Sequence, residues 1–197
     1  TLTGKSAHGA QPHLGNDVVV AASQLISQFQ TIISRNIDPF EQSVLTIGTI
    51  NGGEARNIIA QEVKISGTIR AFKDSVYDEI KYRMEKMIEG IQVGFNLEVD
   101  YQMKDFYPVV YNNEKLVDHV IKDLPDDSYE FIQPMMFAED FAFYQQKVPG
   151  MFTMLGTKNE KRGYIHPLHS CYFNFDEEVL IKGVELYLSI AKSYQLI

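Results

Sequence analysis

Apolar residues recur every three or four positions over residues 16–34, the spacing that places them on one face of an α-helix. This stripe comprises Val18, Val19, Ala22, Leu25, Ile26, Phe29, Ile32 and Ile33. Asn16 or Asp17 precedes it and offers a side-chain oxygen suited to an N-cap. A second stripe follows Asp74 and Ser75, which are predicted to cap it, and we expect Gly94 to end that helix. Its members are Val76, Ile80, Met84, Met87, Ile88 and Ile91.

Between and after these helices the period changes to two, which is typical of strands. Residues 43–50 alternate and run into Asn51-Gly52-Gly53, so a strand and a turn are predicted. Further strands are predicted at 63–72 and 95–101, and Leu2-Thr3 is interpreted as the tail of an incoming strand. The resulting β-α-β-β-α-β order predicts an α+β, ferredoxin-like domain over residues 1–105, with two helices on one face of a four-stranded antiparallel sheet.

Beyond Pro108 the pattern is less regular. It predicts helices near 113–124, 138–147 and 176–194 and one short apolar strand at 151–155. Three helices and one strand leave little sheet to cover, so residues 106–197 are expected to dock on strands that this chain lacks. The chain also starts without methionine in the middle of a motif, and we interpret it as a piece of a longer polypeptide.

Composition limits the kinds of molecule that the chain is expected to bind. Hydrophobic residues make up 45% and charged residues 22%, as in soluble globular proteins. A net charge of -8 with no Lys/Arg-rich run argues against nucleic acid or an anionic membrane surface as partner. The single cysteine, Cys171, excludes an intrachain disulfide framework, and no apolar run has the length of a membrane span or the pattern of a signal peptide. A cytoplasmic protein is therefore expected.

The first fifteen residues carry candidate chemistry. His8 and His13 lie five residues apart in a turn that contains Gly4, Gly9, Pro12 and Gly15, so both imidazoles are presented from loop backbone. This placement indicates a site. The alternative is a pair of ordinary surface histidines, because the spacing matches no closed zinc site and brings no cysteine pair.

Several motifs along the chain resemble one family. They are Gly4-Lys5-Ser6-Ala7-His8, Pro12-His13-Leu14-Gly15, Ile33-Ser34-Arg35-Asn36-Ile37-Asp38-Pro39, Ala55-Arg56-Asn57-Ile58-Ile59, Gly67-Thr68-Ile69-Arg70, Ala138-Glu139-Asp140-Phe141 and Leu168-His169-Ser170. In this order they are similar to the bacterial amidohydrolase branch of the aminoacylase and carboxypeptidase-G-like dinuclear metallopeptidases. Members of that branch include N-acyl-amino-acid amidohydrolases, hippurate hydrolases and N-acetyldiaminopimelate deacetylases.

The resemblance implies an architecture and a reaction. Residues 1–105 would be a lid that mediates homodimerisation, and residues 106–197 the C-terminal α/β segment of a catalytic domain whose first part lies upstream. The full-length enzyme would bind two divalent ions per subunit, zinc, manganese or cobalt, and hydrolyse the amide of an N-acyl amino acid or small peptide.

Four residues match functional positions of the family. His8 matches the lid histidine that reaches across the dimer to the scissile carbonyl oxygen, where a preorganised donor stabilises developing negative charge. Asn57 and Arg70 match residues expected to bind the substrate carboxylate, which suits the planar fork of arginine. Their alternative interpretations are a turn residue and a solvated strand end. His169 matches a metal-ligand histidine.

Other residues of these motifs are less specific. His166 is interpreted as incidental, and Leu168 and Cys171 depart from the family pattern. Cys171 is expected to be a small buried hydrophobe rather than a thiolate ligand. Glu139 and Asp140 either support the metal site or form an acidic helix N-terminus.

Because the remaining ligands and the general base of the family lie upstream, we expect this chain to be inactive and largely metal-free by itself. The competing hypothesis is a non-catalytic ferredoxin-like module that dimerises or binds a small carboxylate. Such a module has no need for His8 and His169 at opposite ends of the chain.

Overall fold

The computed structural model describes residues 1–197 and divides the chain into two compact units. The first unit comprises Thr1–Val109 together with Met136–Ala138. The second unit comprises Val110–Met135 together with Glu139–Ile197. The structure contains no helix that is both long and apolar enough to cross a membrane.

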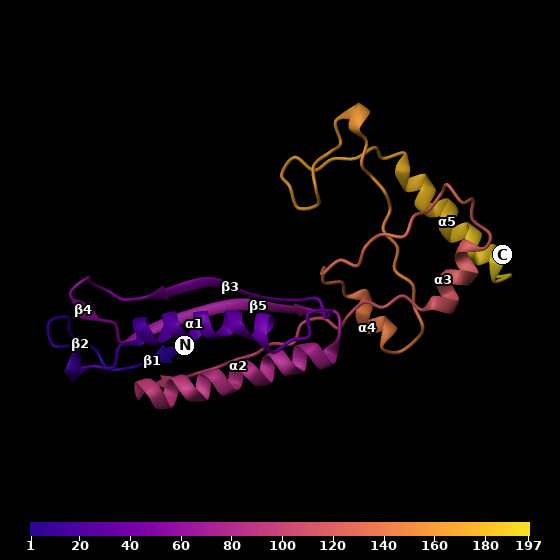
Figure 1. The fold of residues 1–197 in the computed structure, drawn as a ribbon. Coiled ribbons are helices and arrows are strands. Elements are labelled where there is room, and N and C mark those ends of the chain that lie inside the picture. The colour runs from indigo at the N-terminus through magenta and orange to yellow at the C-terminus, as the bar shows by residue number, and fades with distance from the viewer. The chain divides into compact units, whose positions relative to one another are not determined.

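A four-stranded antiparallel sheet forms the first unit (Figure 1). Its strands are β1 (Leu2–Thr3), β3 (Ser43–Gly52), β5 (Glu62–Ala71) and β6 (Glu98–Val99), in the order β3-β5-β1-β6. The long hairpin β3/β5 pairs Ser43 with Ala71, and its register shifts once between Ile47 and Thr49. The strands predicted from alternation are confirmed, although the last is shorter than expected.

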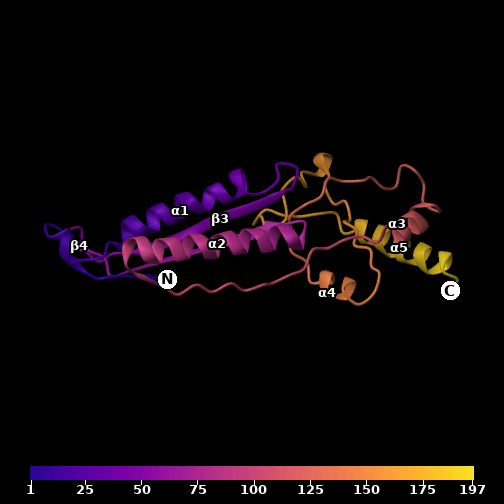
Figure 2. The same cartoon turned by 60° about the horizontal axis from the view of Figure 1, so that its bottom comes forward.

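Two helices, α1 (Val18–Arg35) and α2 (Asp74–Phe95), run along this sheet (Figures 1 and 2). Asp17 is the N-cap of α1, because its carboxylate accepts from the backbone nitrogens of Val19 and Val20. Both predicted helices are confirmed, and their stripes form the core with the sheet. That core includes Leu2, Val18, Ala22, Leu25, Phe29, Ile32, Leu45, Val63, Val76, Ile80, Met84, Ile88 and Ile91.

The structure corrects two details of these helices. Gly94 does not end α2, which continues through Phe95 and terminates at Asn96 in a left-handed conformation with φ 49°. Asparagine tolerates that conformation better than most residues, and a glycine inside a helix only weakens it. Val19, which the sequence pattern placed in the apolar stripe of α1, is 47% exposed. It lies outside the face of α1 that packs on the sheet.

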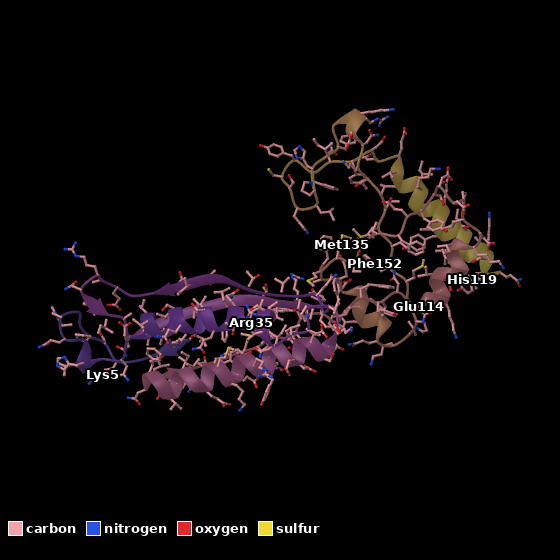
Figure 3. All side chains as sticks on the ribbon, in the orientation of Figure 1. Lys5, Arg35, Glu114, His119, Met135 and Phe152 are labelled. Atoms are coloured by element: carbon pink, nitrogen blue, oxygen red, sulfur yellow. The ribbon has the colours of Figure 1, made fainter.

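The second unit contains helices and loops. Its elements are α3 (Glu114–Ile121), α4 (Phe141–Gln145), the short 3-10 helix η2 (Glu160–Arg162) and α5 (Val179–Ser193). A contact between α3 and α5 is made by His119, whose Nε2 lies 3.1 Å from the Ser193 hydroxyl and whose ring centroid lies 4.2 Å from that of Tyr194 (Figure 3). The three predicted helices are confirmed, each with fewer residues than the pattern indicated.

The strand predicted at 151–155 is wrong as a strand of this chain. No ladder forms there, and the second unit contains no sheet. A strand requires a neighbour to receive its backbone hydrogen bonds, and here only the Asn112 side chain meets the backbone of Phe152. Val120 and Ala142 are the only apolar side chains that this unit buries.

Candidate functional site

His8 and Asn57 are brought together by a small two-stranded sheet at one end of the first unit. Strand β2 (Ala7–His8) pairs with β4 (Ile58–Ile59), so that His8 lies opposite Ile58. The backbone nitrogen of Gly9 then donates to the Asn57 carbonyl at 2.8 Å. A Cβ at position 9 would lie 3.0 Å from that oxygen, so glycine permits this close approach. Two residues from separate motifs are thereby neighbours.

The His8 imidazole is exposed and has one ring nitrogen engaged. Its Nδ1 accepts from the backbone nitrogen of Ala10 at 3.1 Å. A ring nitrogen that accepts carries no proton, so in the neutral ring the proton is on Nε2. Because Nε2 forms no hydrogen bond within the chain, it is free to donate to a group from outside. His13, in the 3-10 helix η1 (Pro12–Leu14), is also exposed.

Arg70 lies near the C-terminal end of β5, where it pairs with Val44. Its side chain is exposed, and Nη1 donates to the Met136 carbonyl at 3.0 Å. A guanidinium has five N–H donors, so most of them remain for a carboxylate. The contact with Met136 was missed by sequence reasoning, because it joins positions 66 residues apart through a backbone carbonyl that no motif encodes.

Within one chain, Arg70 lies far from His8 and Asn57. Strand β5 begins at Glu62, which is paired with Thr3, and the β2/β4 sheet lies beyond that end of the hairpin (Figure 1). Lys5, just before β2, marks the same end (Figure 3). Eight residue steps of a strand separate Glu62 from Arg70, which is about 26 Å. One substrate molecule cannot span the two groups in a single chain.

His169 lies in the second unit, in a loop before α5, and its side chain is exposed. Its backbone φ is 66°, in the left-handed region that is unfavourable for most side chains. The other non-glycine residues with positive φ are Asn96 and Gln195, and each of them follows the end of a helix. His169 instead lies in a turn that is closed by the hydrogen bond from the Ser170 nitrogen to the Pro167 carbonyl at 3.2 Å, and the third residue of such a turn can adopt a positive φ.

Around His169, one prediction about a neighbour is wrong. Cys171, expected to be buried, is exposed, because the second unit has almost no core in which to bury it. His166 packs on Tyr172 with ring centroids 5.4 Å apart. Asp140 immediately precedes α4 but makes no capping bond, and Glu139 is half-buried.

The residues of this chain do not form a metal site by themselves. Nowhere do three or more histidine, cysteine, aspartate or glutamate side chains converge as metal ligands would. A single imidazole such as His169 does not hold a divalent ion tightly, since zinc sites use three or four protein ligands.

Comparison with protein families gives one match over nearly the whole chain. The sequence model of peptidase family M20/M25/M40 matches residues 5–193. Among curated proteins, N-acetyldiaminopimelate deacetylase of Bacillus subtilis is 37% identical over 188 residues, which are 94% of this chain and 49% of that protein. The deacetylase of Oenococcus oeni is 38% identical over 190 residues, 94% of this chain and 48% of that one. This chain thus spans about half the length of the curated relatives it matches.

Solved structures also match nearly all of this chain with about half of their own length. A crystal structure from methicillin-resistant Staphylococcus aureus matches with a TM-score of 0.85 and 30% identity, over 100% of this chain and 51% of that one. A dinuclear metal-binding peptidase of the M20 family from Bacillus subtilis matches with a TM-score of 0.73 and 23% identity, over 96% and 48% of the two chains. The second likeness, at this identity, concerns the fold.

Proposed function

This chain belongs to peptidase family M20/M25/M40, and on that premise we propose that it is part of a metal-dependent amidohydrolase that hydrolyses the amide bond of N-acyl amino acids. Its curated relatives are named as deacetylases of N-acetyldiaminopimelate, an acylated amino acid, which supports this substrate class. The observation that carries the proposal is the His8–Asn57 pair, two exposed residues that the β2/β4 sheet and the Gly9–Asn57 backbone hydrogen bond hold close together, with Nε2 of His8 free to donate.

We assign roles to the two parts of the chain on the same basis. Residues 1–105 are proposed as a ferredoxin-like lid that mediates homodimerisation, and residues 106–197 as the C-terminal segment of the catalytic domain. The strand order β3-β5-β1-β6, with both helices packed in one core with the sheet, supports the first assignment. The sparse core of the second unit supports the second, since a segment of a larger domain lacks part of its own packing.

His8 is proposed to donate from Nε2 to the scissile carbonyl oxygen. The hydrogen bond from Ala10 leaves the proton on the outward nitrogen, so the donor is oriented before substrate arrives. A donor fixed where negative charge grows stabilises the transition state more than the substrate. Arg70 is proposed to bind the substrate carboxylate with the N–H groups that Met136 does not occupy.

The distance between these groups supports a site that is shared between two protomers. Because Arg70 and the His8–Asn57 pair lie at opposite ends of β5, one substrate meets all three only when the pair comes from the partner subunit. A homodimer formed through the lid is therefore part of the proposal. Asn57 accompanies His8 in this arrangement, and Arg70 belongs to the other protomer.

His169 is proposed as one ligand of a divalent ion, zinc, manganese or cobalt, in the full-length enzyme. Its exposed ring, presented from a turn before α5, supports that role. The other ligands would come from polypeptide outside residues 1–197, since this chain offers no group of three. We accordingly propose that the chain alone is inactive and binds metal weakly.

Subunit mixing in the full-length enzyme tests this arrangement. His8→Ala and Arg70→Ala should each reduce the kcat/KM of their own homodimers about a hundredfold or more, because each removes a group that holds the reacting substrate. When the two variants are mixed and allowed to exchange subunits, one site of each heterodimer regains both groups. Activity should then rise to about a quarter of the unmodified value, because half of the dimers are mixed and half of their sites are intact.

A second mixture of variants tests whether His8 and Asn57 of one site come from the same protomer. His8→Ala mixed with Asn57→Ala should recover nothing, because both groups come from the same protomer and each site lacks one of them. His13→Ala, on the neighbouring 3-10 helix, is the matched control and should leave activity unchanged. Recovery in this second mixture, or none in the first, would refute the trans arrangement. Full activity in every variant would show that none of these residues takes part in the reaction and would refute the roles proposed for them.

A further inference from the structure

The segment between β1 and α1 is exposed and carries His8 (Figure 1). It comprises residues 5–16, here called the His8 segment, and none of its side chains is buried. A bridge between Lys5 and Asn16 closes its base, where the Asn16 nitrogen donates to the Lys5 carbonyl at 2.9 Å. The position of the His8 imidazole therefore depends on hydrogen bonds rather than on burial in the core.

Close backbone contact fixes Asn16 at this base. A Cβ at Gly4 would lie 2.5 Å from the Asn16 carbonyl oxygen, and a Cβ at Gly15 would lie 2.6 Å from the Lys5 carbonyl oxygen. Both distances are shorter than real Cβ contacts, so the two sides of the bridge approach this closely only with glycine at both positions. A displacement of Asn16 would therefore displace Lys5 and the residues that follow it.

The Asn16 side chain joins this base to the end of α2. Its Nδ2 donates to the Phe95 carbonyl at 3.2 Å and also to the Asn96 carbonyl. The last carbonyls of a helix have no partner within the helix, so they are available as acceptors. Figure 1 shows the C-terminal end of α2 at the same end of the first unit as the β2/β4 sheet. No other side chain of the His8 segment donates a hydrogen bond to the rest of the chain.

The structure separates the roles of two adjacent polar residues. Asp17 caps the start of α1 with its carboxylate, whereas Asn16 uses its amide at the end of α2. An amide provides two N–H donors, and Asn16 meets two carbonyl acceptors. Aspartate has almost the same size but only acceptors when it is ionised, and its charge is unfavourable at the negative end of a helix dipole. Asn16→Asp should therefore break this link with almost no change in side-chain volume.

We propose that Asn16 is a positioning residue, which holds the His8 segment on the end of α2 so that Nε2 of His8 points towards the substrate of the partner subunit. The proposal rests on the role proposed for His8. It assigns to the same reaction a residue that touches no substrate, because a displacement of about 1 Å at a catalytic group can reduce the rate up to about a hundredfold. The effect of Asn16 on the reaction thus passes through His8 alone.

Hydrogen exchange in this chain tests the structural part of the proposal. Asn16→Asp should speed exchange about tenfold at the amides of Gly9 and Gln11, each of which donates to a carbonyl at 2.8 Å, because the segment opens more often. Amides of the β3/β5 hairpin should keep their rates. Asp17→Ala is the matched control, since it removes a cap from the same unit and should not speed exchange selectively in the His8 segment.

Steady-state kinetics of the full-length enzyme test the functional part. Asn16→Asp should lower kcat about tenfold and leave KM within about twofold, because a donor to developing charge acts on the transition state rather than on substrate binding. In an enzyme that already carries His8→Ala, the same change should alter kcat by less than about twofold, since the two residues act as one unit. Asp17→Ala should leave kcat unchanged in either background.

Three results would overturn the proposal: exchange in the His8 segment that stays unchanged, exchange that accelerates equally in the hairpin, or a loss of kcat that persists in the His8→Ala background. Faster local exchange with full kcat would also refute it. In that case His8→Ala decides about the proposed function, because an inactive His8→Ala enzyme leaves the role of His8 intact and an active one counts against it.

Discussion

The two units have similar shares of apolar residues along the chain but very different cores. All but two of the buried apolar side chains belong to the first unit, where two helices pack with a sheet whose strands are paired. The second unit has helices of comparable amphipathicity, yet α5 buries no residue completely. The difference lies in the sheet, because a helix buries its stripe only when another layer is present to receive it.

This contrast shows that the period of apolar residues determines where a helix forms but not how far that helix is buried and stabilised. Helix α5 forms where the sequence predicts it, while its apolar face remains exposed. Matched substitutions in the two units should therefore differ in size, although they look alike in sequence. Because the chain has no tryptophan, far-UV circular dichroism and hydrogen exchange are the suitable measurements.

The largest expected difference comes from truncating one isoleucine in each unit. Ile80 of α2 is 0% exposed, and Ile80→Ala should lower the free energy of unfolding of the first unit by about 3 kcal/mol through lost burial and a cavity. Ile181 of α5 is 60% exposed, so Ile181→Ala should cost under about 0.5 kcal/mol. Urea unfolding followed by circular dichroism checks both values. Equal costs would mean that the second unit has a core of its own.

Replacement of glycine by alanine should lower stability at one position in the first unit and raise it at one position in the second. In the β3/β5 hairpin, a Cβ at Gly67 would lie 2.1 Å from the Thr46 carbonyl oxygen, so Gly67→Ala should destabilise the first unit by about 2 kcal/mol. In α5, a Cβ at Gly183 would meet only Leu155 at ordinary contact distance, and Gly183→Ala should stabilise that helix by about 1 kcal/mol. Hydrogen exchange resolved by segment separates the effects. Destabilisation by Gly183→Ala would argue against the position of Leu155.

Helix N-termini give a smaller contrast. The Asp17 carboxylate accepts from two backbone nitrogens of α1, so Asp17→Ala should cost about 1 kcal/mol, and Asp17→Asn should retain most of the stability. Glu178, at the start of α5, makes no capping bond, and Glu178→Ala should have almost no effect. Thermal unfolding of the four proteins, unmodified chain included, tests this. A large loss from Glu178→Ala would contradict the prediction.

The smallest effect concerns alkaline pH. Burial raises the pKa of Tyr101 to about 12 from the usual 10.0, so the folded state favours the neutral phenol. The associated stability is fully present below pH 10 and is lost as pH rises towards 12, because the unfolded chain releases its proton first. Tyr101→Phe should reduce this loss, which pH-dependent urea unfolding measures. The pKa of Tyr77 is also raised, by burial and by the hydrogen bond that its hydroxyl donates to Asp105. Part of the loss of stability at alkaline pH should therefore remain in Tyr101→Phe.

At neutral pH the same variant gives a second result. The Tyr101 hydroxyl is buried without a hydrogen-bond partner, so Tyr101→Phe should be neutral or stabilising by up to about 1 kcal/mol. Tyr187→Phe, at an exposed position of α5, is the control and should change stability at neither pH. A clear loss of stability from Tyr101→Phe at pH 7 would indicate that its hydroxyl has a partner.

The sequence predicted the elements of the first unit well because its helices are long and strongly periodic. Boundaries were less certain, as Gly94 and Asn96 illustrate, since either residue type ends helices and only the backbone conformation distinguishes them. The segment 151–155 has the composition of a strand, but no neighbouring strand of this chain pairs with it. The burial predicted for Cys171 failed for the same reason, because burial depends on neighbouring layers.

Resemblance to a family identified the residues of the candidate site, and the structure showed which of them are neighbours. His8 and Asn57 are neighbours because Ala7 pairs with Ile59 across the β2/β4 sheet. Arg70 lies at the other end of β5 because the register pairs it with Val44. Neither relation is written in a motif, since the three residues lie at positions 8, 57 and 70 with no local pattern that links them.

By itself, the sequence determined which segments become helices and strands, because the period of apolar residues acts within a few residues of each position. It also determined the family, through motifs spread over residues 5–193. Only the tertiary structure decided which side chains are buried, which nitrogen of His8 is free and which candidate residues can meet. These properties depend on strand register and on layers contributed by distant residues, and the second unit shows how they remain incomplete when such a layer is not present in the chain.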